Sequence, residues 1–219
     1  MSKMISLGQL TNQCGNKLSR NDQSSHTTKC SLGLNEAVNK NKLTIVLSEE
    51  DIPSRFKNTP IELLLRYHNL RQTFDKYDKA KILVGMCMDN RKHLHIPDNF
   101  AYIIRSAGGN LRYSEFKVSY SISVGDVEAI VLIGHNNCGM TNLISKEQKF
   151  VNGLVQKCGW EEETAKQHFR SYLPMFEIGN EIDFVIGEAK RLREKYKSML
   201  VVPLFYNVED NLLYIVEED

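Results

Sequence analysis

Two short apolar runs constrain the fold of this chain more than any other feature. One is Ile-Leu-Val-Gly-Met-Cys within residues 81–87, and the other is Ala-Ile-Val-Leu-Ile at residues 129–133. Neither run alternates between apolar and polar residues, which is typical of parallel strands buried on both faces of a sheet. Each run leads directly into a residue that can bind a metal ion, Cys87 in the first case and His135 in the second.

Segments of helix length separate the strand-like runs. We expect strands at 81–87, 100–104, 129–133, 199–205 and 212–216, and helices at 60–75, 113–124, 140–150, 161–172 and 179–197. This alternation predicts an α/β fold of the Rossmann-like kind, with a mostly parallel central sheet and helices on both faces. The last strand follows a Glu-Asp-Asn turn, so we expect it to be an antiparallel edge strand at the C-terminus.

The composition divides the chain into two regions. Residues 1–40 are rich in Ser, Thr, Asn and Lys and show no periodicity, so we expect a flexible N-terminal tail there and a single domain over 41–219. Lys and Arg number 28 and Asp and Glu 27, which leaves no basic surface for nucleic acid or for a membrane. No apolar run approaches the roughly 18 residues of a membrane-spanning helix.

The cysteines bear on the cellular compartment. The chain has five of them, and its N-terminal residues lack the apolar segment of a secretory signal. An odd count without such a signal argues against a disulfide framework and favours a reducing, cytoplasmic compartment. Import into an organelle directed by the N-terminal segment remains an alternative.

The residues at the ends of the two runs predict a metal site. The carboxyl ends of parallel strands meet at one edge of the sheet, so Cys87 and His135 converge there if their strands are neighbours. Cys138 follows His135 by three residues in Gly-His-Asn-Asn-Cys-Gly, within reach of the same ion. Two thiolates and one imidazole suit zinc and leave its fourth position open for water. The alternatives are a redox disulfide between Cys87 and Cys138, or buried side chains without chemistry.

Asp89 and Arg91 follow the first ligand closely in Cys-Met-Asp-Asn-Arg. Residues two apart point to the same side of an extended backbone, and an arginine can hold a carboxylate with two hydrogen bonds. A carboxylate fixed beside the metal can accept a hydrogen bond from the bound water and orient it. Two alternatives stay open: Asp89 is itself the fourth metal ligand, or the two residues form an ordinary surface ion pair.

Other side chains near these motifs have two interpretations each. His93 and His95 either transfer protons, since histidine titrates near neutral pH, or lie exposed in a loop. Arg105, with Gly108 and Gly109 after it, either shapes a pocket or an anion site, or belongs to a turn that begins a helix. We expect His68, in the first helix, to be a packed or interfacial residue rather than a ligand.

Three motifs in the same order resemble those of the β-class carbonic anhydrases. They are Cys87-x-Asp89-x-Arg91, Ile-Arg-Ser-Ala-Gly-Gly at 104–109, and Gly-His135-x-x-Cys138-Gly. The resemblance covers about residues 60–216. Met88 and the double glycine are similar to a divergent branch of the family that includes hydrolases of carbonyl sulfide and carbon disulfide.

The resemblance implies a β-carbonic anhydrase-like zinc domain over 41–219, with Zn²⁺ held by Cys87, His135 and Cys138. It implies that zinc-bound hydroxide converts carbon dioxide reversibly to bicarbonate, with Asp89 and Arg91 as the catalytic pair. In some members of the family the aspartate binds the zinc. The family further implies a homodimer, or a tetramer of dimers, with N-terminal helices embracing the partner and the pocket near the interface.

Two rival functions follow from the same residues. The first is hydrolysis of carbonyl sulfide or carbon disulfide at the same zinc, which a narrow, apolar access route would favour. The second is a non-catalytic zinc-binding or bicarbonate-sensing protein, in which Asp89 closes the metal site. The presence of Arg91 argues against the second, because a purely structural site needs no partner to draw the aspartate away.

Overall fold

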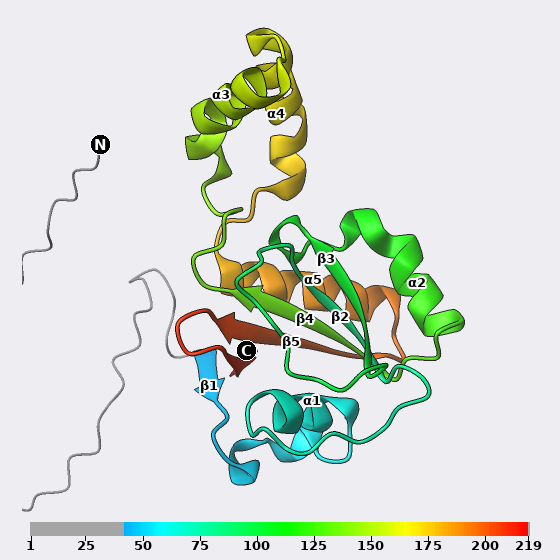
Figure 1. The fold of residues 1–219 in the computed structure, drawn as a ribbon. Helices are drawn as coiled ribbons and strands as arrows, with labels where there is room; N and C mark the ends of the chain where they lie inside the picture. The colour runs from blue at the N-terminus through cyan, green and yellow to red at the C-terminus, as the bar shows by residue number, and fades with distance from the viewer. Residues whose placement is uncertain (1–41, 219) are drawn as a thin grey trace, which may run out of the picture. The chain divides into compact units, whose positions relative to one another are not determined.

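The computed structural model describes residues 42–218 (Figure 1). The tail expected at 1–40 lies outside the described residues, and the domain boundary at 41 therefore stays a prediction. None of the helices in the described part of the chain is long and apolar enough to cross a membrane.

A six-stranded sheet forms the centre of the described residues, in the order β1-β6-β5-β4-β2-β3. Its strands are β1 (Leu43–Ile45), β2 (Ile82–Cys87), β3 (Ala101–Ser106), β4 (Ala129–His135), β5 (Leu200–Asn207) and β6 (Leu212–Val216). Strands β3, β2, β4 and β5 are parallel, which confirms the predicted mostly parallel sheet. Strand β6 runs antiparallel to β5 as expected, but the antiparallel edge position beside it is occupied by the short strand β1.

Helices cover both faces of the sheet, also as predicted (Figure 1). Along β2 the side chains of Ile82, Val84 and Met86 share one core with α1 (Pro60–His68). Leu83 points to the other face, where α2 (Glu115–Ser123) and α5 (Glu181–Lys195) pack. Every residue of β2 and β4 is buried, which explains why both strands read as continuous apolar runs in the sequence.

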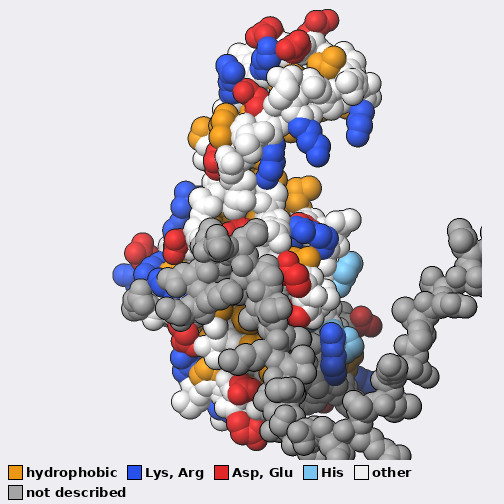
Figure 2. Space-filling view, turned by 90° about the vertical axis from the view of Figure 1, so that its left-hand side faces the viewer, with side chains coloured by type: hydrophobic (Ala, Val, Ile, Leu, Met, Phe, Trp, Pro, Cys, Tyr) orange, Lys and Arg blue, Asp and Glu red, His pale blue; other side chains and the backbone are white. Residues whose placement is uncertain are grey.

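Between β4 and α5 the chain forms a hairpin of two helices, α3 (Glu147–Cys158) and α4 (Glu162–Phe176), that stands away from the sheet (Figure 1). The helix expected at 140–150 begins later, because Asn142 has a left-handed backbone and a 3₁₀ turn fills 143–146. Both acidic and basic side chains lie on the surface of the hairpin (Figure 2), where Arg170 pairs with Glu147. This pattern agrees with the balanced charge of the sequence.

The helix predicted at 60–75 begins as expected but ends early. Thr59 caps its first turn by accepting a hydrogen bond from the Ile61 amide (3.2 Å), and a proline opens the helix. It ends before Asn69, whose side chain donates to the carbonyl oxygens of Val46 (3.0 Å) and Leu213 (2.8 Å). The Asn69 side chain also accepts from the Leu213 amide (3.0 Å). These bonds tie the end of α1 to strand β6.

Replacing Asn69 by alanine is expected to lower the free energy of unfolding by about 2–3 kcal/mol, because three hydrogen bonds to backbone groups are lost together. Urea unfolding in the presence of a chelator measures this loss without a contribution from bound metal. Asn152→Ala is the matched control, since Asn152 is exposed on α3 and bonds only to Gln148 in the described structure. Equal midpoints for the two variants would contradict the expectation.

Candidate metal centre

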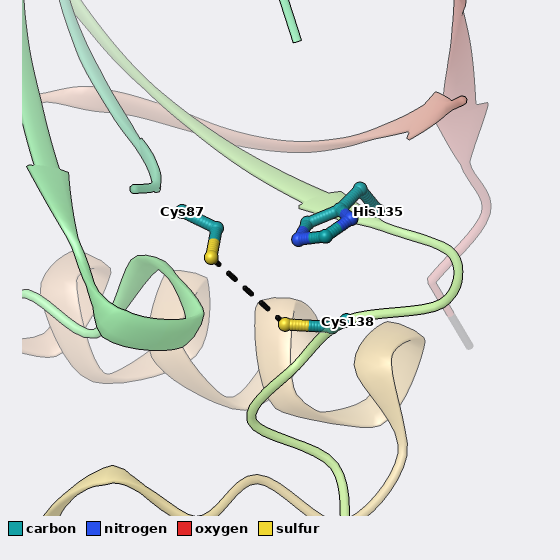
Figure 3. A group of neighbouring side chains, drawn as sticks. All are labelled: Cys87, His135 and Cys138. Carbon is teal, nitrogen blue, oxygen red and sulfur yellow. Dashed lines mark hydrogen bonds between the residues drawn. The ribbon is translucent and has the colours of Figure 1, made fainter. Parts of the chain in front are cut away.

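The structure brings the three predicted metal ligands together. Strands β2 and β4 are neighbours in register, with Met86 opposite Ile133, so their carboxyl ends lie side by side. One donor atom from each of Cys87, His135 and Cys138 lies within 4.8 Å of the others, and all three side chains are buried (Figure 3). This is the ligand number and chemistry of a zinc site with one position left for a further ligand.

The imidazole of His135 has the orientation and tautomer of a metal ligand. Its Nδ1 lies 2.9 Å from the carbonyl oxygen of Asn136, which can only accept, so Nδ1 bears the hydrogen. The Nε2 lone pair is buried and has no hydrogen-bond partner among the described residues. Figure 3 shows a ring nitrogen turned toward the two sulfur atoms. A buried lone pair without a partner is unfavourable, and a metal ion at this position satisfies it.

The two cysteine sulfurs face each other at 3.9 Å, far beyond the roughly 2.05 Å of a disulfide bond, and both thiols are free. Their hydrogen bond lowers the pKa of the Cys87 thiol and raises the pKa of Cys138, because the pair stabilises one shared negative charge. A divalent cation placed between the sulfurs replaces the shared proton. The two sulfurs are therefore reduced, and together with His135 they fit a metal ion.

The loop that bears His135 and Cys138 is anchored to the turn between β5 and β6. The Asn136 side chain donates to Glu209 and accepts from the Val208 amide at 2.8 Å. Asn137, which has a left-handed backbone, also donates to Glu209 (3.2 Å). The two asparagines between the ligands are the sequence signal for this support, but nothing near Glu209 in the sequence indicates its role.

The carboxylate of Asp89 is held by Arg91, and both residues lie on the loop that follows β2. Its carboxylate accepts hydrogen bonds from the Arg91 amide (3.0 Å), from Nε (3.0 Å) and from Nη2 (2.6 Å). The guanidinium lowers the pKa of Asp89 well below its usual range, so the carboxylate is ionised. The Asp89 side chain is only 16% exposed, unlike a surface ion pair, and its oxygens are not in the compact group of metal donors. Arg91 also donates to the carbonyl oxygen of Asn137 (2.9 Å), which links the two ligand loops.

Arg105 supports the first ligand loop rather than facing a pocket. Its guanidinium donates to the carbonyl oxygens of Lys92 (3.0 Å), Cys87 (3.4 Å) and Asp89 (3.4 Å). The glycines that follow it form a 3₁₀ turn at Ala107–Gly109, and helix α2 begins only at Glu115, so this turn does not begin the helix directly. The sequence did not indicate that one arginine gathers three carbonyl groups of the loop.

His68, His93 and His95 do not belong to the group of metal donors. His68 is buried: its Nδ1 accepts from the His95 amide and its Nε2 donates to the Asn211 carbonyl, both at 3.0 Å. Burial lowers the pKa of His68 to about 4, so it is a neutral packed residue, as expected. His93 and His95 are exposed in the loop after β2. Their part in proton transfer stays a prediction.

An apolar cavity of about 380 Å³ lies between the helical hairpin and the ligand loops. Its walls include Ala107 after β3, Met140 after the ligand loop, and Phe150, Tyr172 and Phe176 of the hairpin. Met140 also packs against the cluster formed by Cys87, Cys138 and Ile178. Met140 therefore contacts both the cavity and the cluster that contains the two cysteine ligands.

Comparison with known proteins finds solved structures that share this fold. No family model matches the sequence, and no curated protein matches it. Among solved structures, β-carbonic anhydrase isoform I of Trichomonas vaginalis has a TM-score of 0.53 at 20% identity over 68% of this chain and 90% of its own. The carbonic anhydrase of Streptococcus mutans has a TM-score of 0.50 at 20% identity over 76% of this chain and 99% of its own. A carbon disulfide hydrolase in its apo form has a TM-score of 0.49 at 19% identity, covering 78% and 93%.

Fold and site together define an α/β protein with a buried Cys-His-Cys group at the carboxyl ends of two central parallel strands. The fold is that of the β-class carbonic anhydrases, as the motifs predicted.

Proposed function

We propose that this protein is a zinc enzyme of the β-carbonic anhydrase family that interconverts carbon dioxide and bicarbonate. The observation that supports it most is the buried, unpartnered lone pair of His135 Nε2 beside the two facing sulfurs of Cys87 and Cys138. A buried donor set of this kind is unfavourable without a cation. Zinc bound there would supply a Lewis acid that lowers the pKa of a coordinated water from about 15.7 to about 7.

In this proposal, Asp89 and Arg91 govern the fourth position of the metal. Arg91 keeps Asp89 ionised and holds its two oxygens through the guanidinium and the backbone amide. An ionised carboxylate accepts hydrogen bonds only, so it orients a hydroxyl group whose oxygen is directed at the carbon of the substrate. Because Arg91 also bonds to the Asn137 carbonyl, the carboxylate keeps its position relative to the ligand loop of β4.

The same contacts argue against the non-catalytic alternative, in which Asp89 closes the metal site. To bind the metal, Asp89 would have to exchange its bonds with Arg91 for a bond to the ion. Hydrogen bonds from the amide and the guanidinium of Arg91 engage both oxygens of the carboxylate, and all of them would have to break before Asp89 could reach the ion. The arrangement favours a site that is open to solvent or substrate.

A second candidate function is the hydrolysis of carbonyl sulfide or carbon disulfide at the same centre. The observation that favours it is the cavity bounded by Met140, whose lining is largely apolar although it includes His168 and Tyr172. Linear, uncharged molecules partition into such a cavity, and the sulfur compounds gain more than carbon dioxide because they are larger and more polarisable. The cavity thus supports neutral linear substrates as a class.

One experiment separates these functions. We expect about one zinc ion per purified chain and a rate of carbon dioxide hydration, followed by stopped flow, well above the buffer rate. The same preparation is assayed in parallel for hydrogen sulfide release from carbonyl sulfide. Faster turnover of carbonyl sulfide would assign the second function, and zinc without turnover of either substrate would assign the non-catalytic one.

The expected cytoplasmic location is supported by the free thiols of the site. A reducing compartment keeps Cys87 and Cys138 available as metal ligands.

A homodimer is also part of the proposal, and the edge of the sheet at β3 is the face that supports it. Among residues 42–218 this strand pairs on one side only, with β2. Large apolar side chains are exposed along it and on the adjacent helix α2, among them Tyr102, Ile103, Phe116 (82% exposed) and Tyr120. An unpaired edge beside an exposed apolar surface is typical of a contact with a second copy.

Replacing Phe116 by aspartate is expected to convert the dimer to a monomer, because it places a charge in the centre of this apolar surface. Light scattering after size exclusion measures the mass of the particle in solution. Leu47→Asp is the control, since Leu47 is 65% exposed and follows β1 at the opposite edge of the sheet. A dimer that survives Phe116→Asp would show that another face joins the subunits.

A further inference from the structure

We propose that the buried ammonium group of Lys92 selects anions over neutral molecules as the added ligand of the metal centre, an inference that rests on the zinc function proposed above. Lys92 would act through its charge rather than by touching the metal or the reacting atoms. It is therefore a specificity-determining residue for small monovalent anions, the class to which bicarbonate belongs.

The first observation is the burial of an unpaired charge. The side chain of Lys92 is completely buried, and its Nζ has no hydrogen-bond partner among the described residues. Burying an ammonium without a partner is costly, so lysine is rarely found in this environment unless it interacts with a charge or a ligand. None of the acceptors in the described residues lies within hydrogen-bond distance of Nζ, which leaves that bond to a molecule that enters the site.

The second observation places Lys92 beside the metal centre. The guanidinium of Arg105 binds the carbonyl oxygens of Cys87, Asp89 and Lys92 together, so the backbones of these residues converge on one group. The backbone of Lys92 therefore lies beside the loop that follows the first metal ligand, and its side chain is buried. In agreement, burial lowers the pKa of Lys92 while the charges of Cys87, Asp89 and Cys138 oppose the change.

The third observation is the balance of charge. A zinc ion held by two thiolates and a neutral imidazole is formally neutral, and Asp89 with Arg91 forms a neutral pair. An anion added to the metal therefore leaves one uncompensated negative charge in a buried site. Lys92 supplies the compensating positive charge, buried where solvent screens it least. Arg105 is exposed, so its charge is screened more strongly.

The test compares an anion and a neutral molecule as ligands of the same metal. The protein is loaded with cobalt(II), and the visible spectrum is titrated with thiocyanate and, separately, with imidazole. Lys92→Met keeps the length and removes the charge. We expect its dissociation constant for thiocyanate to rise about tenfold, which corresponds to about 1.4 kcal/mol, while that for imidazole stays within about twofold.

Two further proteins make the result specific. Lys79→Met removes a lysine from an exposed ion pair with Asp126, before the start of β2 and thus at the opposite end of that strand. Its thiocyanate affinity is expected to equal that of the wild type. Lys92→Gln, which is neutral but polar, repeats the measurement if Lys92→Met does not fold. Thermal unfolding of the metal-free Lys92→Met variant is expected at the same or a higher temperature, because a buried unpaired charge has been removed.

The outcomes are distinct. Thiocyanate affinities of Lys92→Met and Lys92→Gln equal to the wild type, or an equal loss for thiocyanate and imidazole, would overturn the role of Lys92 and leave the proposed function intact. A wild-type protein that takes up no cobalt or zinc would overturn both together. A selective loss of thiocyanate binding supports the inference.

Discussion

Replacing Cys138 by serine is expected to deprive the protein of most of its zinc. A serine hydroxyl is a far weaker zinc ligand than a thiolate, and the remaining site would offer one sulfur and one imidazole. A structural zinc site contributes about 10–16 kcal/mol over its full ligand set. Loss of one thiolate should therefore weaken zinc binding by on the order of 100-fold or more.

Competition with a chromophoric chelator measures the zinc affinity, and elemental analysis measures the zinc content of the purified variant. Cys158→Ser is the matched control, because Cys158 is a free, exposed cysteine at the end of α3. It should keep both the zinc and the rate of carbon dioxide hydration. If Cys138→Ser retains a full complement of zinc, the ligand set has been misassigned.

Replacing Asp89 by asparagine is expected to leave the zinc in place and to lower the rate of carbon dioxide hydration by about 10²–10⁴-fold, the usual contribution of a positioned acid–base group. The amide has nearly the same shape as the carboxylate, but it is neutral and can donate. It therefore loses both the ion pair with Arg91 and the ability to hold a hydroxyl group in one orientation.

Stopped-flow hydration and zinc content must be measured on the same preparation of Asp89→Asn. Asp126→Asn is the control, since Asp126 forms an exposed ion pair with Lys79 and should change neither quantity. The diagnostic outcome is loss of zinc from Asp89→Asn: it would make Asp89 a metal ligand and favour the closed, non-catalytic site.

Much of the fold could be predicted from the sequence because burial on both faces leaves a simple pattern. Strands β2 and β4 are continuous apolar runs, and their boundaries were predicted to within two residues. Strand β1 was not predicted, because three residues form a strand only through their pairing with β6. The length of α1 was overestimated for a similar reason, since the bonds that end it at Asn69 reach residues distant in the sequence.

In the site, too, the features that depend on nearby residues could be predicted, whereas those that depend on contacts between distant residues could not. Cys87, His135 and Cys138 are indicated by residue type and spacing alone, and the sheet then places them together. The burial of Lys92 could not be predicted, because lysine in a polar loop is normally solvated. Glu209 was missed because its contact with the ligand loop depends on how β5 and β4 lie side by side.

The pairing of β2 with β4 also has a consequence for the maturation of the protein. The segment between these strands includes β3 and α2, so the sulfur of Cys87 meets its two partner ligands only after a long crossover has closed. Such non-local pairing is slow, and an unfolded chain has no preformed chelate with which to capture the ion. For the zinc site proposed here, we therefore expect the ion to enter after the sheet has assembled, and we expect its removal to loosen the carboxyl ends of the two central strands first.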